Sequence, residues 1–567
     1  MAVYGSRAAS SKTTAQEIAK SLKESRLKSR RQTVNRLHDP HRVNVVSEEL
    51  CDDIINYIGP SIERHRGCDL VDINPGVGLW SKKLHRFLEP RKHVLMEPDV
   101  ERYRSFLQPL LDSPRCSTQI KSGFVWKDVL DVIRTELPLQ QAVSGEAVPT
   151  RNDTLLVTAN VATHPKKAYR NFASISTMVI YQLLSCIRHS SLFQSYGLVR
   201  MLLWMNDDDK TRLLPRAINR RRRSAFENET SCEWFHEVAS PEPIVDQLML
   251  RNEWIDAESG CRVIQRMEEQ GLVMPAHRQP AAYKELKKKR DWMGKKLADL
   301  NMPFITRPYQ SELVQVEEQL KRDKESRKLS LRRYALIKTG TSDHEARRIS
   351  HDLWQRREAI FQLASESPDE FAAADAEWNA RIDCITKNQR NIFLSNKDNL
   401  HIFREDPPVM LWDRRTYEPL LTDVEEFYPR ARTVLVDIQP KAMHPLLRQY
   451  GQGTERAADM SDVMLRSWFL NLTLPCPKAM DTIWAGAGEL AKQCPSLTDP
   501  SLGGSPMSRY GAINARMLSE RQWTELLQAW MDWPFRPSYE HLMGRVLHEP
   551  GEDDDEDEVT SKVASSL

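Results

Sequence analysis

A short segment near the start of the chain has the residue types and spacing of a site for a nucleotide-like cofactor. It reads DLVDINPGVGLW from Asp69, an apolar strand that breaks into a glycine turn and continues as a helix. In such a turn, backbone N–H groups at the helix N-terminus face the ligand, and glycine permits close approach. A carboxylate after the next strand would accept both ribose hydroxyls. The predicted cofactor-binding residues are Asp72, Asn74, Gly76, Gly78 and Glu97.

The same segment excludes two other cofactor classes. A dinucleotide-binding fingerprint requires a third glycine where this chain has Ser81, so a dehydrogenase is disfavoured. The chain contains no G-x-x-x-x-G-K-[ST] sequence, so a P-loop ATPase is disfavoured as well.

The elements that must position this turn are strands alternating with helices. The runs CDLVDI, HVLMEP, DTLLVTANV and GLVRMLLWM are short, apolar and separated by helical stretches. This alternation predicts an α/β fold with a Rossmann-like parallel sheet covered on both faces. The runs PPVMLW and TVLVDIQP are predicted to be the last strands of the same sheet, with a charged region inserted between its strands 5 and 6.

Composition divides the 567 residues into six parts. Two of these parts are the first and last parts of the sheet domain. The part between them is rich in Glu, Lys and Arg, and this composition predicts solvated helices. The predicted parts are a basic targeting-like or disordered segment (1–40), the first part of the sheet domain (41–255), a charged helical insertion (256–400), the last strands of the sheet (401–440), a helical C-terminal domain (441–547) and an acidic disordered tail (548–567).

Bulk properties limit the class of protein. Hydrophobic residues make up 40% and charged residues 28% of the chain, and the formal net charge is +2. No apolar run approaches the length that crosses a bilayer, so we expect no membrane insertion. The nine cysteines include no C-x-x-C pair, so we expect a reducing compartment and no metal site.

The first 36 residues carry nine Lys or Arg and only two acids, Glu17 and Glu24. They are also rich in Ser, Thr and Ala, a composition typical of a mitochondrial transit peptide. This predicts removal or disorder of the segment and a location in the mitochondrial matrix. A disordered basic arm that touches nucleic acid is an equally good interpretation of composition alone.

The order of these features resembles a known family. The glycine turn, the strand ending in Glu97 and the strand ending in TANVATHP resemble class I S-adenosylmethionine-dependent methyltransferases. Phe427-Tyr428-Pro429, which leads into TVLVDIQP, resembles their rRNA adenine dimethyltransferase branch. PPVMLWDRRTYEPL, VEEFYPRARTVLVDIQPK and WPFRP look still more like the fungal mitochondrial transcription factor B group, which shares that fold and assists the mitochondrial RNA polymerase. The resemblance implies S-adenosylmethionine as cofactor, whose retention the sequence leaves open.

Three departures from the family pattern bear on activity. The cofactor turn is usually G-P-G-x-G, and here Asn74 replaces the first glycine, a mild change because Asn tolerates left-handed backbone angles. Phe124 stands where the family has an Asp that binds the adenine amine. The family's catalytic N-[LI]-P-[YF] is Asn160-Val161-Ala162-Thr163, which keeps the amide and lacks the proline and the stacking ring. Asn160 is therefore interpreted as a vestigial catalytic residue, and enzyme activity is left open.

A basic cluster follows the fifth strand, near the substrate face of this fold. Phosphate contact is the favoured interpretation and a solvated helix end the alternative. The predicted nucleic-acid-binding residues are Arg216, Arg220, Arg221, Arg222 and Arg223.

Three hypotheses for function follow. The first is a mitochondrial transcription initiation factor whose partners are the mitochondrial RNA polymerase and promoter DNA. The second is an active rRNA adenine dimethyltransferase acting on small-subunit rRNA. The third is a non-catalytic mitoribosome assembly protein. The degenerate NVAT segment disfavours the second, and the targeting-like N-terminus with the DRRTYEPL to VLVDIQPK block favours the first.

Overall fold

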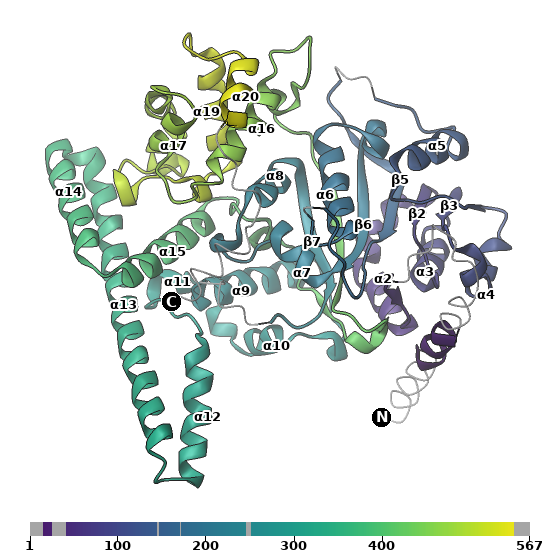
Figure 1. Cartoon of the computed structure of the whole chain (residues 1–567), viewed down its shortest axis with the longest axis horizontal. Helices are drawn as coiled ribbons and strands as arrows, with labels where there is room; N and C mark the ends of the chain where they lie inside the picture. Colours follow the sequence, from purple (N-terminus) through teal and green to yellow (C-terminus); the bar gives the residue numbers. More distant parts are fainter. Residues whose placement is uncertain (1–14, 25–40, 144–146, 171, 245–250, 549–567) are drawn as a thin grey trace.

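An eight-stranded sheet lies at the centre of the molecule (Figure 1). The computed structural model describes residues 15–24, 41–143, 147–170, 172–244 and 251–548. In spatial order the strands are β4 (Cys116–Gln119), β3 (Lys92–Met96), β2 (Asp69–Ile73), β5 (Arg151–Asn160), β6 (Leu198–Asn206), β10 (Thr433–Pro440), β7 (Cys232–Ser240) and β8 (Leu420–Leu421).

The first five strands in this order run parallel, and β10 runs antiparallel to both of its neighbours, β6 and β7. Strand β2, the first strand of this sheet in the sequence, lies inside the sheet: β3 and β4 follow on one side of it, and β5 and β6 follow on the other. This is a Rossmann-like methyltransferase sheet, and the predicted α/β class is confirmed. The strands expected from CDLVDI, HVLMEP, DTLLVTANV, GLVRMLLWM and TVLVDIQP are all present.

Helices bury both faces of the sheet, which is why its strands read as continuous apolar runs. Successive side chains of a strand point to opposite faces. Leu70 and Leu95 therefore pack toward one set of helices, and Val71 and Val94 pack toward the other. The first set is α2 (Glu48–Ile62), α3 (Leu79–Leu88), α4 (Val100–Leu111), α9 (Glu253–Glu269) and α10 (Ala281–Lys288). The second includes α5 (Trp126–Glu136) and α6 (Ile175–Arg188).

Two details of the sheet differ from the sequence-based prediction. PPVMLW forms no strand; its last two residues belong to a short 3₁₀ helix, Leu411–Arg414, packed against the sheet. Pro407 and Pro408 lack the N–H groups that a strand would donate, so the segment cannot pair as expected. Strand β7 precedes the charged insertion, so the insertion lies after the sixth strand of the sheet and not after the fifth.

The insertion is helical and follows β7. Besides α9 and α10, it contains α11 (Leu297–Leu300), α12 (Pro308–Arg322), α13 (Arg327–Glu366), α14 (Pro368–Cys384) and α15 (Lys387–Arg404). Helices α12 and α13 form an antiparallel hairpin that projects from the body of the molecule at the lower left of Figure 1. Exposed ion pairs join the two, including Arg332 to Glu312 at 2.6 Å. The predicted charged helical insertion is confirmed.

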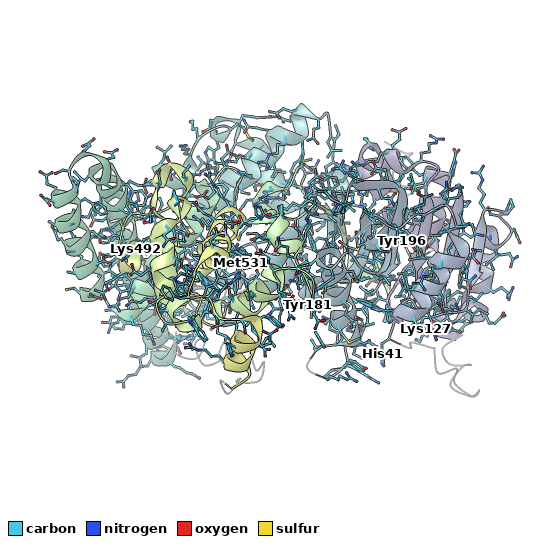
Figure 2. The ribbon with its side chains drawn as sticks, turned by 90° about the horizontal axis from the view of Figure 1, so that it is seen from above. His41, Lys127, Tyr181, Tyr196, Lys492 and Met531 are labelled. Carbon is cyan, nitrogen blue, oxygen red and sulfur yellow. The ribbon has the colours of Figure 1, made fainter. Side chains whose placement is uncertain are left out.

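The C-terminal region is mainly helical, as predicted, and has its own core. Its helices are α16 (Ala457–Trp468), α17 (Cys476–Ile483), α18 (Pro495–Thr498), α19 (Glu520–Asp532) and α20 (Tyr539–His548). Trp468, Trp523 and Trp530 are fully buried there, and the first two rings meet edge to face at 5.5 Å. Figure 2 shows this region, marked by Lys492 and Met531, beside the sheet domain, marked by Tyr196 and Lys127.

The N-terminal segment contributes to the fold in its described part. Residues 15–24 are helical, and Ile18 and Leu22 are buried in the core that covers one face of the sheet. The expectation of disorder therefore does not hold for 15–24; residues 1–14, 25–40 and the predicted acidic tail from 549 lie outside the described residues. No helix in the described ranges has the length and apolarity to span a membrane.

A buried ion pair fixes strand β10 to its antiparallel neighbour β6. Arg200 on β6 and Asp437 on β10 are 0% and 1% exposed, and Arg200 Nε donates to Asp437 Oδ1 at 2.7 Å. The same guanidinium donates to the backbone oxygen of Ser61 at the end of α2. We expect Asp437→Asn to lower the free energy of unfolding by about 3 to 5 kcal/mol, since it leaves a buried cation without its charged partner. Urea unfolding followed by circular dichroism measures this loss.

The matched control is Asp383→Asn, which removes an exposed partner of Arg509 that lies 2.8 Å away. Exposed ion pairs contribute little to stability, so this change should leave the urea midpoint nearly unaltered. Equal losses in the two variants would contradict the structural role assigned to the Arg200–Asp437 pair.

Candidate cofactor and nucleic-acid site

The predicted cofactor residues meet at one edge of the sheet. Strands β2, β3 and β5 are parallel neighbours, so the residues that follow them lie side by side. Asn74 follows β2, Glu97 follows β3, and Asn160 ends β5. The Asn74 side-chain nitrogen donates to the backbone oxygen of Asn160 at 3.4 Å, which joins the glycine turn to the predicted catalytic segment.

The turn has the backbone that its sequence predicts. Asn74, Gly76 and Gly78 have φ angles of 57°, 57° and 69°, so Asn74 does adopt the left-handed conformation. Gly76 is required for a second reason. A Cβ atom at this position would lie 2.1 Å from the side-chain oxygen of Asn44.

The ribose-type carboxylate is already bound by the chain itself. Glu97 is 0% exposed, and its Oε2 accepts hydrogen bonds from Arg42 Nη1 at 2.6 Å and from the Gly76 N–H at 3.0 Å. Its Oε1 accepts from the Asp99 N–H at 3.0 Å. The hydrogen bonds that a cofactor ribose would make to Glu97 are therefore replaced by internal ones.

Asn44 occupies the next backbone donor of the turn. Its Oδ1 accepts from the Val77 N–H at 3.2 Å. The adjoining guanidinium of Arg42 lies 5.6 Å from the centre of the Tyr103 ring, and burial raises the pKa of the Tyr103 hydroxyl. The turn amides at 76 and 77, which would face an anionic ligand, are thus both satisfied by side chains.

A short strand pair holds this segment in place. Strand β1 (Asn44–Val45) pairs antiparallel with β9 (Phe427–Tyr428), the Phe-Tyr-Pro segment that contributed to the family resemblance. Phe427 is buried, and its ring packs 5.8 Å from that of Trp204 on β6. The Phe-Tyr segment therefore acts here as the partner that keeps Arg42 and Asn44 over the glycine turn.

One cavity beside the turn is very small. A cavity of about 10 Å³ is lined by residues that include Asp72, Asn160, Trp80 and Trp204. Trp80 Nε1 donates to Thr158 Oγ1 at 3.0 Å, and its ring meets that of Trp204 edge to face at 6.1 Å. One water needs roughly 10 to 15 Å³ by this measure, and small-molecule sites usually have about 300 to 1,000 Å³. The residues in this arrangement do not fit S-adenosylmethionine.

The segment from Arg42 to Asn44 also covers the predicted catalytic residues. Asn160 Nδ2 donates to the backbone oxygen of Val43 at 2.8 Å, and Asn160 Oδ1 accepts from the Ala162 N–H at 3.2 Å. Val43 N–H in turn donates to the Ala162 oxygen at 2.9 Å. Asn160, Ala162 and Thr163 are buried. The amide that would hold a target base is used to attach the chain's own backbone.

Asp72 and Phe124 flank the turn in different ways. Asp72, at 2% exposed, lies on β2, and its Oδ2 is 3.5 Å from His93 Nε2. Phe124 lies between β4 and α5 and packs against the core on the α5 and α6 face. The preceding Gly123 approaches Ile73 so closely that a Cβ would lie 2.1 Å from it, which places Phe124 near the start of the turn. It presents a ring and not a carboxylate.

Arginines of the predicted basic cluster bind protein groups. Arg221 is 0% exposed; it forms an ion pair with Glu229 and donates to the backbone oxygen of Leu518 at 2.7 Å. Arg216 pairs with the buried Glu237 at 2.8 Å and stacks 3.8 Å from the Trp412 ring. In this conformation, Arg221 joins α8 (Arg223–Ser231) to the C-terminal region, and its guanidinium is not available to a phosphate. Phosphate contact by Arg220, Arg222 and Arg223 stays a prediction.

Sequence reasoning missed the residues that fill the site. Arg42, Val43 and Asn44 act together, yet Arg42 lies 55 positions from Glu97. The available signal was the alternation of polar and β-branched residues in RVNVV, typical of a short strand, directly before the helix cap at Ser47.

No family model matches the chain. It is 26% identical over 148 residues to mitochondrial transcription factor 1 of Saccharomyces cerevisiae, a match that covers 26% of this chain and 39% of the yeast protein. The match supports the resemblance to the rRNA adenine methyltransferase-like family. The chain thus spans about two fifths of the length of this relative.

Two solved structures share a loose likeness. A dimethyladenosine transferase from Plasmodium falciparum has a TM-score of 0.33 at 10% identity, covering 86% of this chain and 96% of that one. An O-methyltransferase family protein from Burkholderia thailandensis has a TM-score of 0.17 at 14% identity, covering 30% and 43%. Our assignment of the fold rests on the strand order of the sheet described above.

The arrangement predicts that S-adenosylmethionine does not stabilise the full chain. With Arg42 and Asn44 in place, 1 mM cofactor should leave the melting temperature unchanged in thermal unfolding. A ligand at 100 times its Kd would instead add about 2.7 kcal/mol to the free energy of unfolding.

We further expect Arg42→Ala to lower the free energy of unfolding by about 3 to 5 kcal/mol, because the buried Glu97 loses its cationic partner.

Arg104→Ala is the matched control on helix α4, since Arg104 pairs with Glu101 at the exposed surface. The melting temperature of this variant should stay close to that of the unmodified chain, because exposed ion pairs contribute little to stability. A rise of several degrees in the melting temperature of the unmodified chain with 1 mM S-adenosylmethionine would show that the site opens readily, against this prediction.

Proposed function

We propose that this protein is a mitochondrial transcription initiation factor that binds nucleic acid through a methyltransferase-like fold and assists the mitochondrial RNA polymerase in the matrix. The observation that carries the proposal is the closed cofactor site, in which Arg42 and Asn44 occupy the partners of a cofactor. Similarity to yeast mitochondrial transcription factor 1 supports it, since that protein's name states the same process.

A surface loop beside the closed site has the chemistry that binds single-stranded nucleic acid. Lys167, Tyr169 and Arg170 are exposed and follow the Asn160 segment directly. Tyr169 is 38% exposed, and the Arg170 guanidinium lies 5.7 Å from its ring. Aromatic rings stack on unpaired bases, and neighbouring cations contact the phosphates, so such a group binds single strands with little sequence choice.

The base of this loop is fixed, which positions the exposed residues. The His164 N–H donates to the His41 oxygen at 2.6 Å, and Lys166 forms ion pairs with Asp208 at 2.7 Å and Asp209 at 2.8 Å. Burial raises the pKa of the Asp209 carboxyl, and the Lys166 charge opposes this rise. Because the loop is fixed at its start, it loses less conformational freedom when it binds a single strand of nucleic acid.

The rRNA dimethyltransferase alternative requires two changes that this conformation opposes. Arg42 would have to leave the buried Glu97, and Asn160 would have to release Val43 to hold a base. The assembly-protein alternative needs neither change, because it requires only RNA contact. A functional assay must therefore separate the transcription-factor hypothesis from the assembly-protein hypothesis.

The deciding experiment is reconstituted transcription with the mitochondrial RNA polymerase of the same organism on its own promoter DNA. We expect the full chain to stimulate specific initiation and to transfer no methyl group to small-subunit rRNA from S-adenosylmethionine. Tight rRNA binding without stimulation would favour the assembly role, and dimethylated adenine would favour the enzyme.

Changing Lys167, Tyr169 and Arg170 together to Ala should weaken binding of a short single-stranded DNA by at least about tenfold, since one stacked base alone contributes about 1 to 3 kcal/mol. Loss of two phosphate contacts should also reduce the slope of log K against log salt by about 1.4. Fluorescence anisotropy at several salt concentrations measures both quantities.

Two controls separate stacking from charge and from general effects. Tyr169→Phe keeps the ring and should bind as the unmodified chain does. Lys492→Ala removes an exposed cation that lies far from His41 in Figure 2 and should also leave binding unaltered. If the triple variant bound DNA with the original affinity and salt slope, the loop would not be a nucleic-acid contact.

A further inference from the structure

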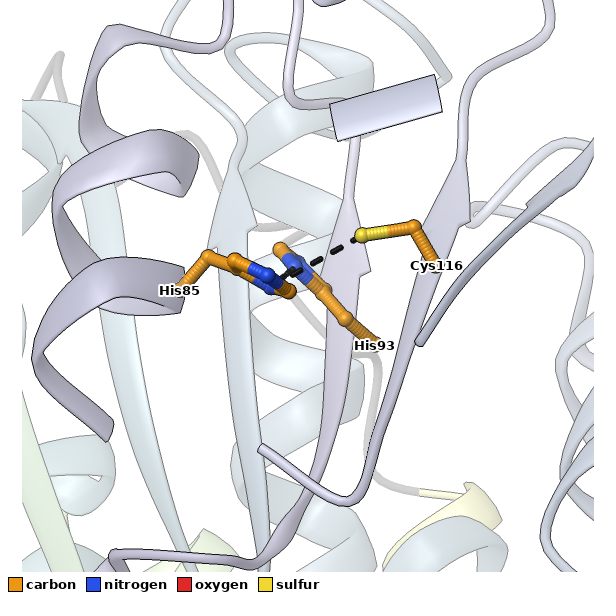
Figure 3. A group of neighbouring side chains, drawn as sticks. All are labelled: His85, His93 and Cys116. Atoms are coloured by element: carbon orange, nitrogen blue, oxygen red, sulfur yellow. Dashed lines mark hydrogen bonds between the residues drawn. The ribbon is translucent and has the colours of Figure 1, made fainter. Parts of the chain in front are cut away.

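Three side chains that bind soft metal ions meet at the edge of the sheet away from β5. His85 lies in the last turn of α3, His93 lies on β3, and Cys116 begins β4 (Figure 3). Figure 3 shows the two imidazoles and the thiol pointing toward a common centre. One ligand atom from each residue lies within 4.8 Å of the other two. The cluster takes no part in the proposed contact with nucleic acid.

The distances between the ligand atoms match a tetrahedral zinc site. His85 Nδ1 lies 3.1 Å from His93 Nδ1 and 3.7 Å from Cys116 Sγ. Zn–N bonds of about 2.0 to 2.1 Å and Zn–S bonds of about 2.3 Å at tetrahedral angles place two nitrogens about 3.3 Å apart, and a nitrogen and a sulfur about 3.6 Å apart. These two separations therefore need shifts of a few tenths of an ångström, and the third pair of ligand atoms, from His93 and Cys116, lies within 4.8 Å.

A second, independent observation concerns the far side of His93. This residue is fully buried, and its Nε2 lies 3.5 Å from Asp72 Oδ2. Neither atom has a hydrogen-bond partner among the described residues. Metal-bound histidines commonly direct their second ring nitrogen at a carboxylate, which fixes the proton there and leaves the other lone pair for the metal. Asp72 is placed to hold the proton on Nε2, so the Nδ1 lone pair points at His85 and Cys116.

We propose that His85 Nδ1, His93 Nδ1 and Cys116 Sγ bind one Zn²⁺ ion, with Asp72 as the residue that orients His93. His85 and Cys116 are only half-buried, so an ion can enter from solvent and water can complete its coordination. Nitrogen and thiolate ligands select zinc and similar soft ions over Mg²⁺ and Ca²⁺, which take oxygen ligands.

The site would tie three elements that lie close together in the sequence. It joins the end of α3 to strands β3 and β4, and Asp72 connects it to the strand that leads into the glycine turn. The ligand spacing is seven residues and then 22, with no C-x-x-C pair, which is why the sequence predicted no metal. Bound zinc would therefore stabilise the side of the sheet formed by β3 and β4, at the end of these strands opposite to Glu97.

The test is metal binding by the untagged, metal-stripped full chain. Isothermal titration with Zn²⁺ should give one strong site per chain, and Mg²⁺ should give none. Titration with Co²⁺ should produce a thiolate-to-cobalt charge-transfer band in the near ultraviolet. Zinc should also raise the melting temperature, because it binds the folded chain alone.

Variants connect this signal to the three ligands. Cys116→Ser and His85→Gln should each weaken zinc binding by more than about 100-fold. Loss of a residue that only orients a ligand already costs about 10- to 100-fold, and loss of a ligand itself should cost more. Asp72→Asn should weaken it by that smaller factor. Cys384→Ser, at the exposed cysteine on α14, is the matched control and should bind as before.

Melting temperatures without metal show that each variant is folded. Zinc binding that survives Cys116→Ser, a cobalt complex without the charge-transfer band, or no zinc uptake at micromolar concentration would overturn the proposal.

Discussion

The buried carboxylate of Glu97 is the constraint on which the rest of the site depends. A carboxylate that is 0% exposed must have charged or hydrogen-bonding partners, because an unpaired buried charge costs several kcal/mol. In a fold that holds a cofactor, the ligand would supply part of this stabilisation. Here Arg42 and the Gly76 N–H supply it from within the chain. The same glycine turn that could hold a ligand is therefore stable without one.

The segment around Arg42 contacts both the glycine turn, where a cofactor would bind, and Asn160, where a target base would bind. Asn44 satisfies the turn at Val77, and Val43 occupies the amide of Asn160. Strand β9 holds the segment, and β9 leads into β10, which the Arg200–Asp437 pair fixes in the sheet. Both reactive positions are closed by one short strand, so opening either position disturbs the other. This supports the proposed role of the fold as a binding platform, for which we proposed the exposed loop after Thr163 as the contact surface.

Much of the sheet could be predicted from sequence, because strands buried on both faces give continuous apolar runs. The left-handed angle at Asn74 followed from the tolerance of Asn, and β10 coincides with TVLVDIQP. Strand β7 was missed because His236 and Glu237 interrupt its apolar pattern; both are buried, and Arg216 pairs with Glu237. The closure of the site could not be predicted, since the partner of Glu97 lies in a distant segment and leaves no local pattern. Arg221 illustrates the same limit, since its guanidinium donates to the backbone oxygen of Leu518, 297 positions away.

The most direct measurement is an experimental structure of the full chain with saturating S-adenosylhomocysteine, the cofactor without its transferable methyl group. Our account predicts that the Arg42 guanidinium remains on the Glu97 carboxylate, that Asn44 remains on the Val77 amide, and that no nucleoside lies beside the turn. A ribose bound to Glu97, with Arg42 displaced and the Val43–Asn160 hydrogen bond broken, would contradict it.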